Sequence, residues 1–268
     1  MKYKYMHFNS SCSYAALAML VSEYGIETED VNIALEMGLP WLFAKEDDVF
    51  LAGPGLQRAK WFDLYLNPRG FSMHEELVVK ESLAEHLKKN GNCMLGLKLH
   101  EGQGKHAVVL CGYDGTYQFF NPVHEGSTES TKIELTEEEL LSAAEKVTVV
   151  GTVEKCPETE HDRSVLFNKS IAVLRENVAD IIKFCKAAHA PEEYVESMNR
   201  LFRSILLDAV TMLDIAGEGV LAEEFRGLQT EYLKFMKSDK AGVLADYISL
   251  NRLNDLTEQY IKLIEKHI

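Results

Sequence analysis

Hydrophobic and polar residues alternate in short blocks along the first part of the chain. Residues from Cys12 to Val21 are apolar on almost every side, which predicts a helix enclosed by other elements and ended by Gly25. Similar patterns predict helices over residues 28–38, 56–66 and 82–89, and strands over 93–99, 106–113, 117–120 and 147–153. A helix followed by an antiparallel sheet predicts an α+β domain.

The dipeptide Asp114-Gly115 lies between two of these strands and indicates a tight antiparallel hairpin, because both residues accept positive φ. In such a hairpin, residues whose numbers sum to about 229 face each other, so Asn121 lies opposite Val108. His106 is two residues away from Val108 and therefore on the same face of the strand. The hairpin thus brings His106 and Asn121 close together.

The pattern changes to helical periodicity beyond a polar stretch at residues 154–162, which contains Pro157. Apolar residues at steps of three and four predict helices over residues 165–188, 191–216, 220–237 and 242–266. Short connections between them favour an antiparallel bundle. We therefore expect two domains, residues 1–155 and 164–268, with the bundle as a scaffold or as the contact between two copies of the chain.

The amino-acid composition limits the classes of molecule that we expect the protein to bind. The chain is 46% hydrophobic and carries a net charge of −14, a field that repels nucleic acid and anionic lipid. No stretch has the length of a membrane span or a secretory signal, so we expect a cytoplasmic protein. The cysteines are odd in number and not closely paired, which favours reduced thiols over disulfides or a zinc site; they stand at positions 12, 93, 111, 156 and 185.

Three residues have the chemistry of a cysteine-nucleophile site. Cys12 stands where a polar turn becomes a helix, and the positive end of the helix dipole stabilises a thiolate there. His106 opens a strand and can take the thiol proton, and Asn121 on the next strand can orient the imidazole. Together they predict a nucleophile, a base and an orienting amide.

Each of these three residues can also be explained by a purely structural role. Cys12 can be a small core residue, His106 a hydrogen-bonded strand end, and Asn121 the start of an Asn-Pro turn. Cys93 and Cys111 are interpreted as core residues, because Cys111 is an odd number of positions from His106 and points to the other face. A weaker alternative to Asn121 as the orienting group is Asp114, although its tight turn already explains it.

A metal site is a further hypothesis, because four possible ligands are close in sequence: His100, Glu101, His106 and His124. Their spacing matches neither a helical i, i+4 pair nor a Cys-x-x-Cys motif. We therefore expect no metal and no cofactor.

The segments Cys12 to Gly25, Gly104 to Asp114 and Phe120-Asn121-Pro122 resemble the papain-like cysteine peptidase superfamily. Within it the first 150 residues are most similar to the bacteriocin-processing (double-glycine leader) peptidase group. Residues 38–43 and the helical C-terminal region are similar to the butirosin-biosynthesis acyltransferase type. The resemblance implies a papain-like fold, with Cys12, His106 and Asn121 as the catalytic residues and a peptide, an amide or an acyl thioester as the substrate.

The chain departs from the peptidases in one place. They usually carry a glutamine several residues before the cysteine, whose amide binds the oxyanion, and no glutamine precedes Cys12 here. Asn9 is the expected substitute, with the backbone N–H of Cys12, and His7 is the other nearby side chain. The chain shows no propeptide or export signal, which favours narrow specificity. We expect hydrolysis or acyl transfer to an amine; the alternative is a non-catalytic papain-like binding or scaffold protein.

Overall fold

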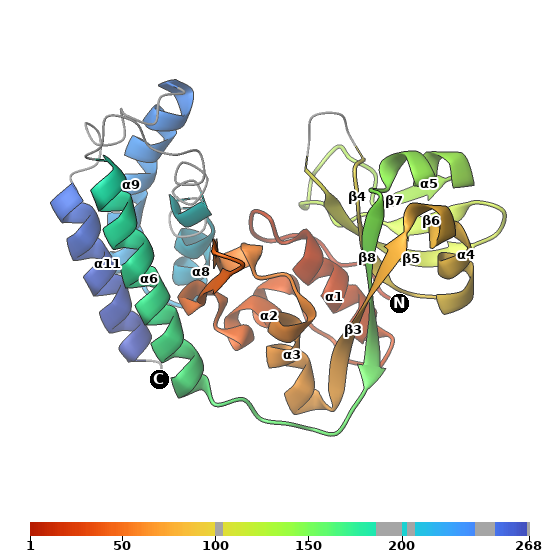
Figure 1. Cartoon of the computed structure of the whole chain (residues 1–268), viewed down its shortest axis with the longest axis horizontal. Helices are drawn as coiled ribbons and strands as arrows, with labels where there is room; N and C mark the ends of the chain where they lie inside the picture. Colours follow the sequence, from red (N-terminus) through yellow and green to blue (C-terminus); the bar gives the residue numbers. More distant parts are fainter. Residues whose placement is uncertain (100–103, 186–199, 203–206, 239–249, 267–268) are drawn as a thin grey trace. The chain divides into compact units, whose positions relative to one another are not determined.

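The computed structural model of the 268-residue chain describes residues 1–99, 104–185, 200–202, 207–238 and 250–266 (Figure 1). The chain forms two compact units, one of residues 1–37 and 57–161, the other of residues 38–56 and 162–268. The polar stretch at residues 154–162, where a domain boundary is predicted, contains the point at which the chain passes from the first unit into the second for the last time. The assignment of residues 38–56 to the second unit is not indicated by the hydrophobic pattern.

The first unit is α+β, with α1 (Cys12–Ser22) as its most enclosed helix. Every residue of α1 from Ser13 to Val21 is buried, and the helix packs against the sheet (Figure 1). The other helical segments are α2 (Asp30–Met37), α3 (Ala59–Leu66), η3 (Asn67–Arg69), α4 (Lys80–Asn90) and α5 (Glu137–Ala143). The predicted helices of this unit are thus confirmed, with α3 beginning three residues later than expected.

In the described part of the chain, six antiparallel strands form the main sheet in the order β3-β8-β4-β5-β6-β7. They are β3 (Phe71–Val79), β4 (Met94–Leu97), β5 (His106–Tyr113), β6 (Tyr117–Phe120), β7 (Lys132–Leu135) and β8 (Val147–Lys155). The predicted hairpin register is confirmed where Val109 pairs with Phe120. A bulge at Cys111 shifts the register nearer the turn.

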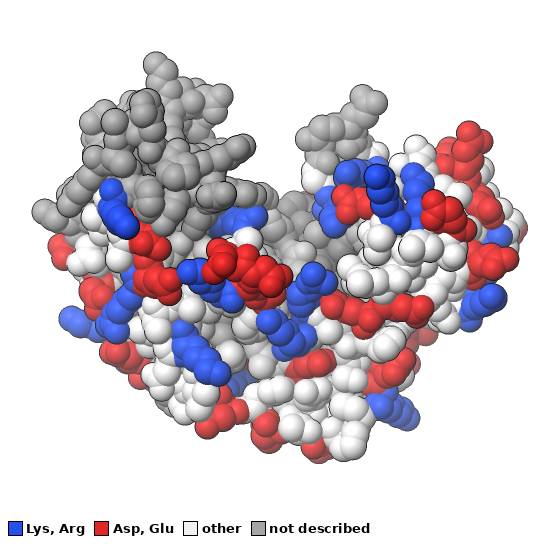
Figure 2. Space-filling model, in the orientation of Figure 1, with Lys and Arg blue, Asp and Glu red and all other residues white. Residues whose placement is uncertain are grey.

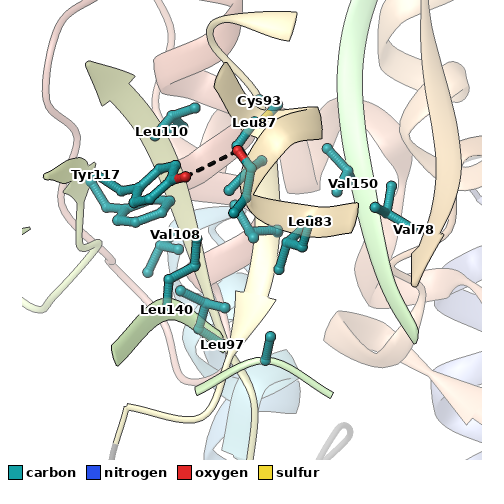
Figure 3. Packing of buried hydrophobic residues seen from close by; sticks show 14 residues of the cluster. Val78, Leu83, Leu87, Cys93, Leu97, Val108, Leu110, Tyr117, Leu140 and Val150 are labelled. Atoms are coloured by element: carbon teal, nitrogen blue, oxygen red, sulfur yellow. Dashed lines mark hydrogen bonds between the residues drawn. The ribbon is translucent and has the colours of Figure 1, made fainter. Parts of the chain in front are cut away.

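One face of this sheet is covered by α4 and α5, and the residues between them form a buried hydrophobic cluster (Figure 3). Tyr117 crosses this cluster, and its hydroxyl donates a hydrogen bond of 3.0 Å to the Ala84 carbonyl. The capping box Thr136 to Glu139 starts α5 and so aims Leu140 into the cluster. The cluster fixes β5, the strand that carries His106.

Two of the strands in the main sheet, β3 and β7, are not predicted by the hydrophobic pattern. In β3 the alternation is interrupted by Glu75, whose carboxylate accepts the Ala59 N–H at the start of α3 at 3.0 Å. A charged residue inside a strand thus caps a helix from another part of the chain. Strand β7 is a short edge strand with exposed Lys132 and Glu134.

The second unit combines a two-stranded hairpin with helices. The elements are η1 (Leu39–Trp41), β1 (Phe43–Glu46), β2 (Val49–Ala52), η2 (Gly53–Gly55), α6 (Arg163–Cys185), α8 (Ala209–Ile215), α9 (Gly219–Ser238) and α11 (Leu250–Glu265). The hairpin turns at Asp47 and Asp48, both with positive φ. Tyr260 of α11 is fully buried among Trp41, Phe43 and Phe225.

The later part of the chain is helical where residues are described, as predicted. Half of the helix expected over residues 191–216 and the start of the one expected over 242–266 lie outside the described residues. No helix in the described part of the chain is long and apolar enough to cross a membrane. On the face shown in Figure 2, acidic and basic side chains are interspersed.

Candidate active site

Cys12 is the first residue of α1, directly after a sharp turn. Ser10 has a positive φ of 58°, unusual for a residue with a side chain, and Ser11 is the N-cap whose carbonyl accepts the N–H groups of Tyr14 and Ala15 at 2.9 Å each. The turn leaves the Cys12 thiol half-buried at the positive end of the helix dipole. This placement matches the sequence prediction.

His106 is the first residue of β5, and its imidazole interacts with the Cys12 thiol strongly enough to shift the pKa of both groups. Its Nε2 lies 2.8 Å from the carbonyl oxygen of Pro122. A carbonyl can only accept, so Nε2 carries the hydrogen, and Nδ1 of the neutral ring is the acceptor that faces a proton donor. The contact with Pro122 therefore selects the tautomer that can take a proton from a thiol.

Burial of the Cys12 thiol acts to raise its pKa. The hydrogen bond and the charge of His106, helped by the backbone N–H groups of Ala107 and Ser13, outweigh burial and bring the pKa below the ordinary thiol value. For His106, burial acts to lower the pKa, and Cys12, the Pro122 carbonyl and Glu129 outweigh it and raise the pKa. Both shifts favour a thiolate beside an imidazolium.

Two other thiols of the same unit behave in the opposite way. Cys93 is fully buried, and burial raises its pKa to about 12. Burial also raises the pKa of Cys111, whose thiol donates to the Gln118 carbonyl at 3.3 Å. Cys111 is half-buried at the bulge rather than part of the core cluster, which corrects the expectation that it packs in the core.

The side chain of Asn121 is buried directly before Pro122, but it is not the group that His106 contacts. Its Nδ2 donates to the Ser130 carbonyl at 2.8 Å, and its Oδ1 has no hydrogen-bond partner among the described residues. The Tyr3 hydroxyl donates to the Asn121 carbonyl at 2.9 Å. Asn121 therefore holds in place the segment that supplies the Pro122 carbonyl. The sequence motif identifies side chains only, so it could not show that a main-chain carbonyl is the hydrogen-bond acceptor for His106.

The other candidates lie elsewhere or are otherwise engaged. Asn9 is exposed, and its side chain forms no hydrogen bond to another described residue. Asp114 accepts from Thr116 and Gln118 within the hairpin turn, at 3.3 and 2.9 Å. No group of three or more His, Cys, Asp or Glu side chains in the described ranges could hold a metal ion. Residues 100 and 101, considered for a metal, lie outside the described residues.

A polar cleft of about 570 Å³ lies at the opposite end of α1. It is lined by Leu20 in the last turn of α1, by Glu23 and Tyr24 directly after the helix, and by polar groups of β3, β8 and α4. The helix rises about 1.5 Å per residue, so its last turn is about 15 Å from Cys12. This cleft is therefore separate from the thiol.

The chain is similar to a solved structure of the peptidase domain of Streptococcus ComA, a bifunctional ABC transporter involved in a quorum-sensing pathway. The similarity has a TM-score of 0.38 and 12% sequence identity, and it covers 56% of this chain and 98% of that domain. No family model matches the chain, and no curated protein matches it. A functional conclusion therefore depends on the geometry around Cys12 and His106.

Proposed function

We propose that this protein is a cysteine-nucleophile acyl-transfer enzyme, with a papain-like arrangement of its first unit and a thioester formed at Cys12. The observation that carries the proposal is the interaction of Cys12, at the first turn of α1, with the imidazole of His106. The pKa shifts of both members favour the charged pair, whereas burial alone raises the pKa of Cys93. A reactive thiolate requires this kind of environment.

The proposed reaction begins when Nδ1 of His106 takes the proton of the Cys12 thiol. The sulfur then attacks the carbonyl carbon of the substrate, a C–S bond forms, and the electron pair of the carbonyl π bond moves onto oxygen. When this intermediate collapses, the bond to the leaving group breaks and His106 returns the proton to that group. Throughout, the Pro122 carbonyl holds Nε2–H, which keeps the ring in one orientation.

Water or an amine then attacks the thioester and releases Cys12. Hydrolysis and acyl transfer share every step up to this point, so the same site serves a peptide, an amide or an acyl thioester as the substrate. Asn121 takes part by fixing the segment that supplies the Pro122 carbonyl.

Phenyl thioacetate, an activated thioester, tests the proposal directly. We expect intact-mass spectrometry to detect an acetyl adduct on the wild type and on a Cys156→Ala control, and none on Cys12→Ala. An adduct that amines clear faster than water identifies a transferase, and an adduct that only water clears identifies a hydrolase. A folded wild-type protein without any adduct contradicts the proposal and leaves the non-catalytic binding protein.

A further inference from the structure

A second histidine is held beside the candidate site by a buried carboxylate. Nδ1 of His7 lies 2.6 Å from Oδ1 of Asp30, and the backbone N–H of His7 donates to Oδ2 of the same carboxylate at 2.8 Å. Asp30 is fully buried at the start of α2, whereas 42% of the His7 side chain is exposed. An ionised carboxylate only accepts, so Nδ1 carries a hydrogen and Nε2 is left at the exposed edge of the ring.

The path of the chain brings His7 level with Cys12. The backbone N–H of Lys2 donates to the Ser22 hydroxyl at the far end of α1. From Lys2 to His7 an extended chain spans up to about 16 Å at about 3.3 Å per residue, and α1 is about 15 Å long from Cys12 to Ser22. Residues 2–7 are therefore long enough to reach back along the helix, and only four residues connect His7 to Cys12.

The same segment also touches the residues that hold His106. The backbone N–H of Met6 donates to the Val123 carbonyl at 2.9 Å, and Nδ1 of His124 lies 3.0 Å from the Met6 carbonyl. Val123 directly follows Pro122, whose carbonyl binds His106. Met6, the residue directly before His7, is thus bonded to the residue that follows Pro122.

Besides His7, no side-chain donor for the oxyanion is assigned among the described residues of the candidate site, which has a nucleophile and a base. Backbone N–H groups in the first turn of α1 can supply one donor. Asn9, the donor expected from the sequence, is exposed and held by no hydrogen bond to a described residue. His7 differs from Asn9 because two hydrogen bonds to Asp30 fix its backbone and its ring. A preorganised donor costs no reorganisation when charge develops on the oxygen.

We propose that His7, fixed by Asp30, is the oxyanion donor of this site. The inference rests on the proposed function. In this role the ring carries a hydrogen on both nitrogens: as the Cys12–carbon bond forms, Nε2–H is donated to the oxygen that receives the carbonyl electron pair, while Nδ1–H stays on Asp30. On collapse the leaving group departs, and His7 keeps both protons. Other charged groups near this segment are His124 and the ion pair of Lys4 with Glu29, at 2.8 Å.

Two reactions of Cys12 separate this role from a role in activating the thiol. Alkylation by iodoacetamide is a displacement at a CH₂ carbon and forms no oxyanion. Acetylation by p-nitrophenyl acetate forms an oxyanion, and its rate is read from the released p-nitrophenolate. A matched pair of variants is His7→Met and His7→Gln, which have similar shapes but differ in the N–H donor. His74→Ala, an exposed histidine on β3, is the control.

We expect His7→Met to lower the acetylation rate by about 100- to 1000-fold, the cost of one oxyanion donor, and to leave alkylation within about twofold. His7→Gln should recover at least about tenfold of this loss, and His74→Ala should match the wild type. Asp30→Asn should slow acetylation in the wild type and have no effect on acetylation in the His7→Met background, because Asp30 acts through His7.

Three results overturn the inference about His7. One is acetylation of His7→Met within about threefold of the wild type. Another is an equal loss in His7→Gln and His7→Met, which assigns His7 a structural role. The third is an equal loss in the rates of alkylation and acetylation, which indicates that His7 activates the Cys12 thiol instead. If wild-type Cys12 is neither alkylated preferentially nor acetylated, the proposed function itself fails.

Discussion

At the scale of single residues, the candidate site depends on a main-chain carbonyl as much as on side chains. The residue types in the sequence indicate Cys12, His106 and Asn121, and in the structure the first two interact, which lowers the pKa of the Cys12 thiol. Asn121 lies one residue before Pro122, whose carbonyl oxygen is the acceptor that His106 contacts. Main-chain contacts depend on the path of a loop, here residues 121–131, and side-chain identity does not encode them.

The role of Asn121 can be tested by replacing it with alanine. Asn121→Ala removes the bond to the Ser130 carbonyl and releases the segment that carries Pro122, so we expect acetylation by p-nitrophenyl acetate to slow by about 100-fold. The matched control is Asn92→Ala, which removes an amide bonded to Glu23 at 3.0 Å beside the other end of α1. Unchanged acetylation in Asn121→Ala contradicts an orienting role for this segment.

At the scale of elements, local patterns predict most helices and the central strands. The Asp114-Gly115 turn, the capping box at Thr136 and the enclosed α1 are each encoded by residues close in sequence. Elements that depend on distant partners are not predicted. Strand β3 contains a charged residue that caps α3, and the β1-β2 hairpin turns on two aspartates rather than on Asp-Gly or Asn-Gly.

The junction before η1 shows how strongly one residue can be constrained. Gly38 has φ of +75°, and a Cβ built there would lie 2.7 and 2.9 Å from the ring of Phe167 in α6. Gly217 has a similar φ of +81° with no atom near such a Cβ. Denaturant unfolding should show that Gly217→Ala costs about 1 to 2 kcal/mol. Gly38→Ala should cost about 1 to 3 kcal/mol more, from the clash; equal costs contradict this account of Gly38.

At the scale of the whole molecule, the candidate chemistry belongs to one of the two units. Cys12, His106 and Pro122 all lie in the unit of residues 1–37 and 57–161, while residues 38–56 fold with the later helices. The hydrophobic pattern marks the seam near residue 160 but not this insertion, because its strands and turns resemble those of the first unit.

The most direct test of the central claim is the pH dependence of iodoacetamide labelling, followed for each cysteine by peptide mass spectrometry. The thiolate is the reactive form, so a lowered pKa moves the rise in Cys12 labelling to lower pH and makes Cys12 the fastest cysteine near neutral pH. Cys93, with its pKa raised to about 12, should stay unlabelled in the folded protein.

His106→Ala removes the imidazole that does most to lower the Cys12 pKa and leaves burial, which raises it, so the rise in labelling should move to higher pH. Because one pKa unit changes the thiolate fraction about tenfold, we expect labelling of Cys12 at neutral pH to fall at least about tenfold. Slow, equal labelling of all cysteines, or a Cys12 profile that His106→Ala leaves unchanged, contradicts the proposal of a Cys12 nucleophile activated by His106.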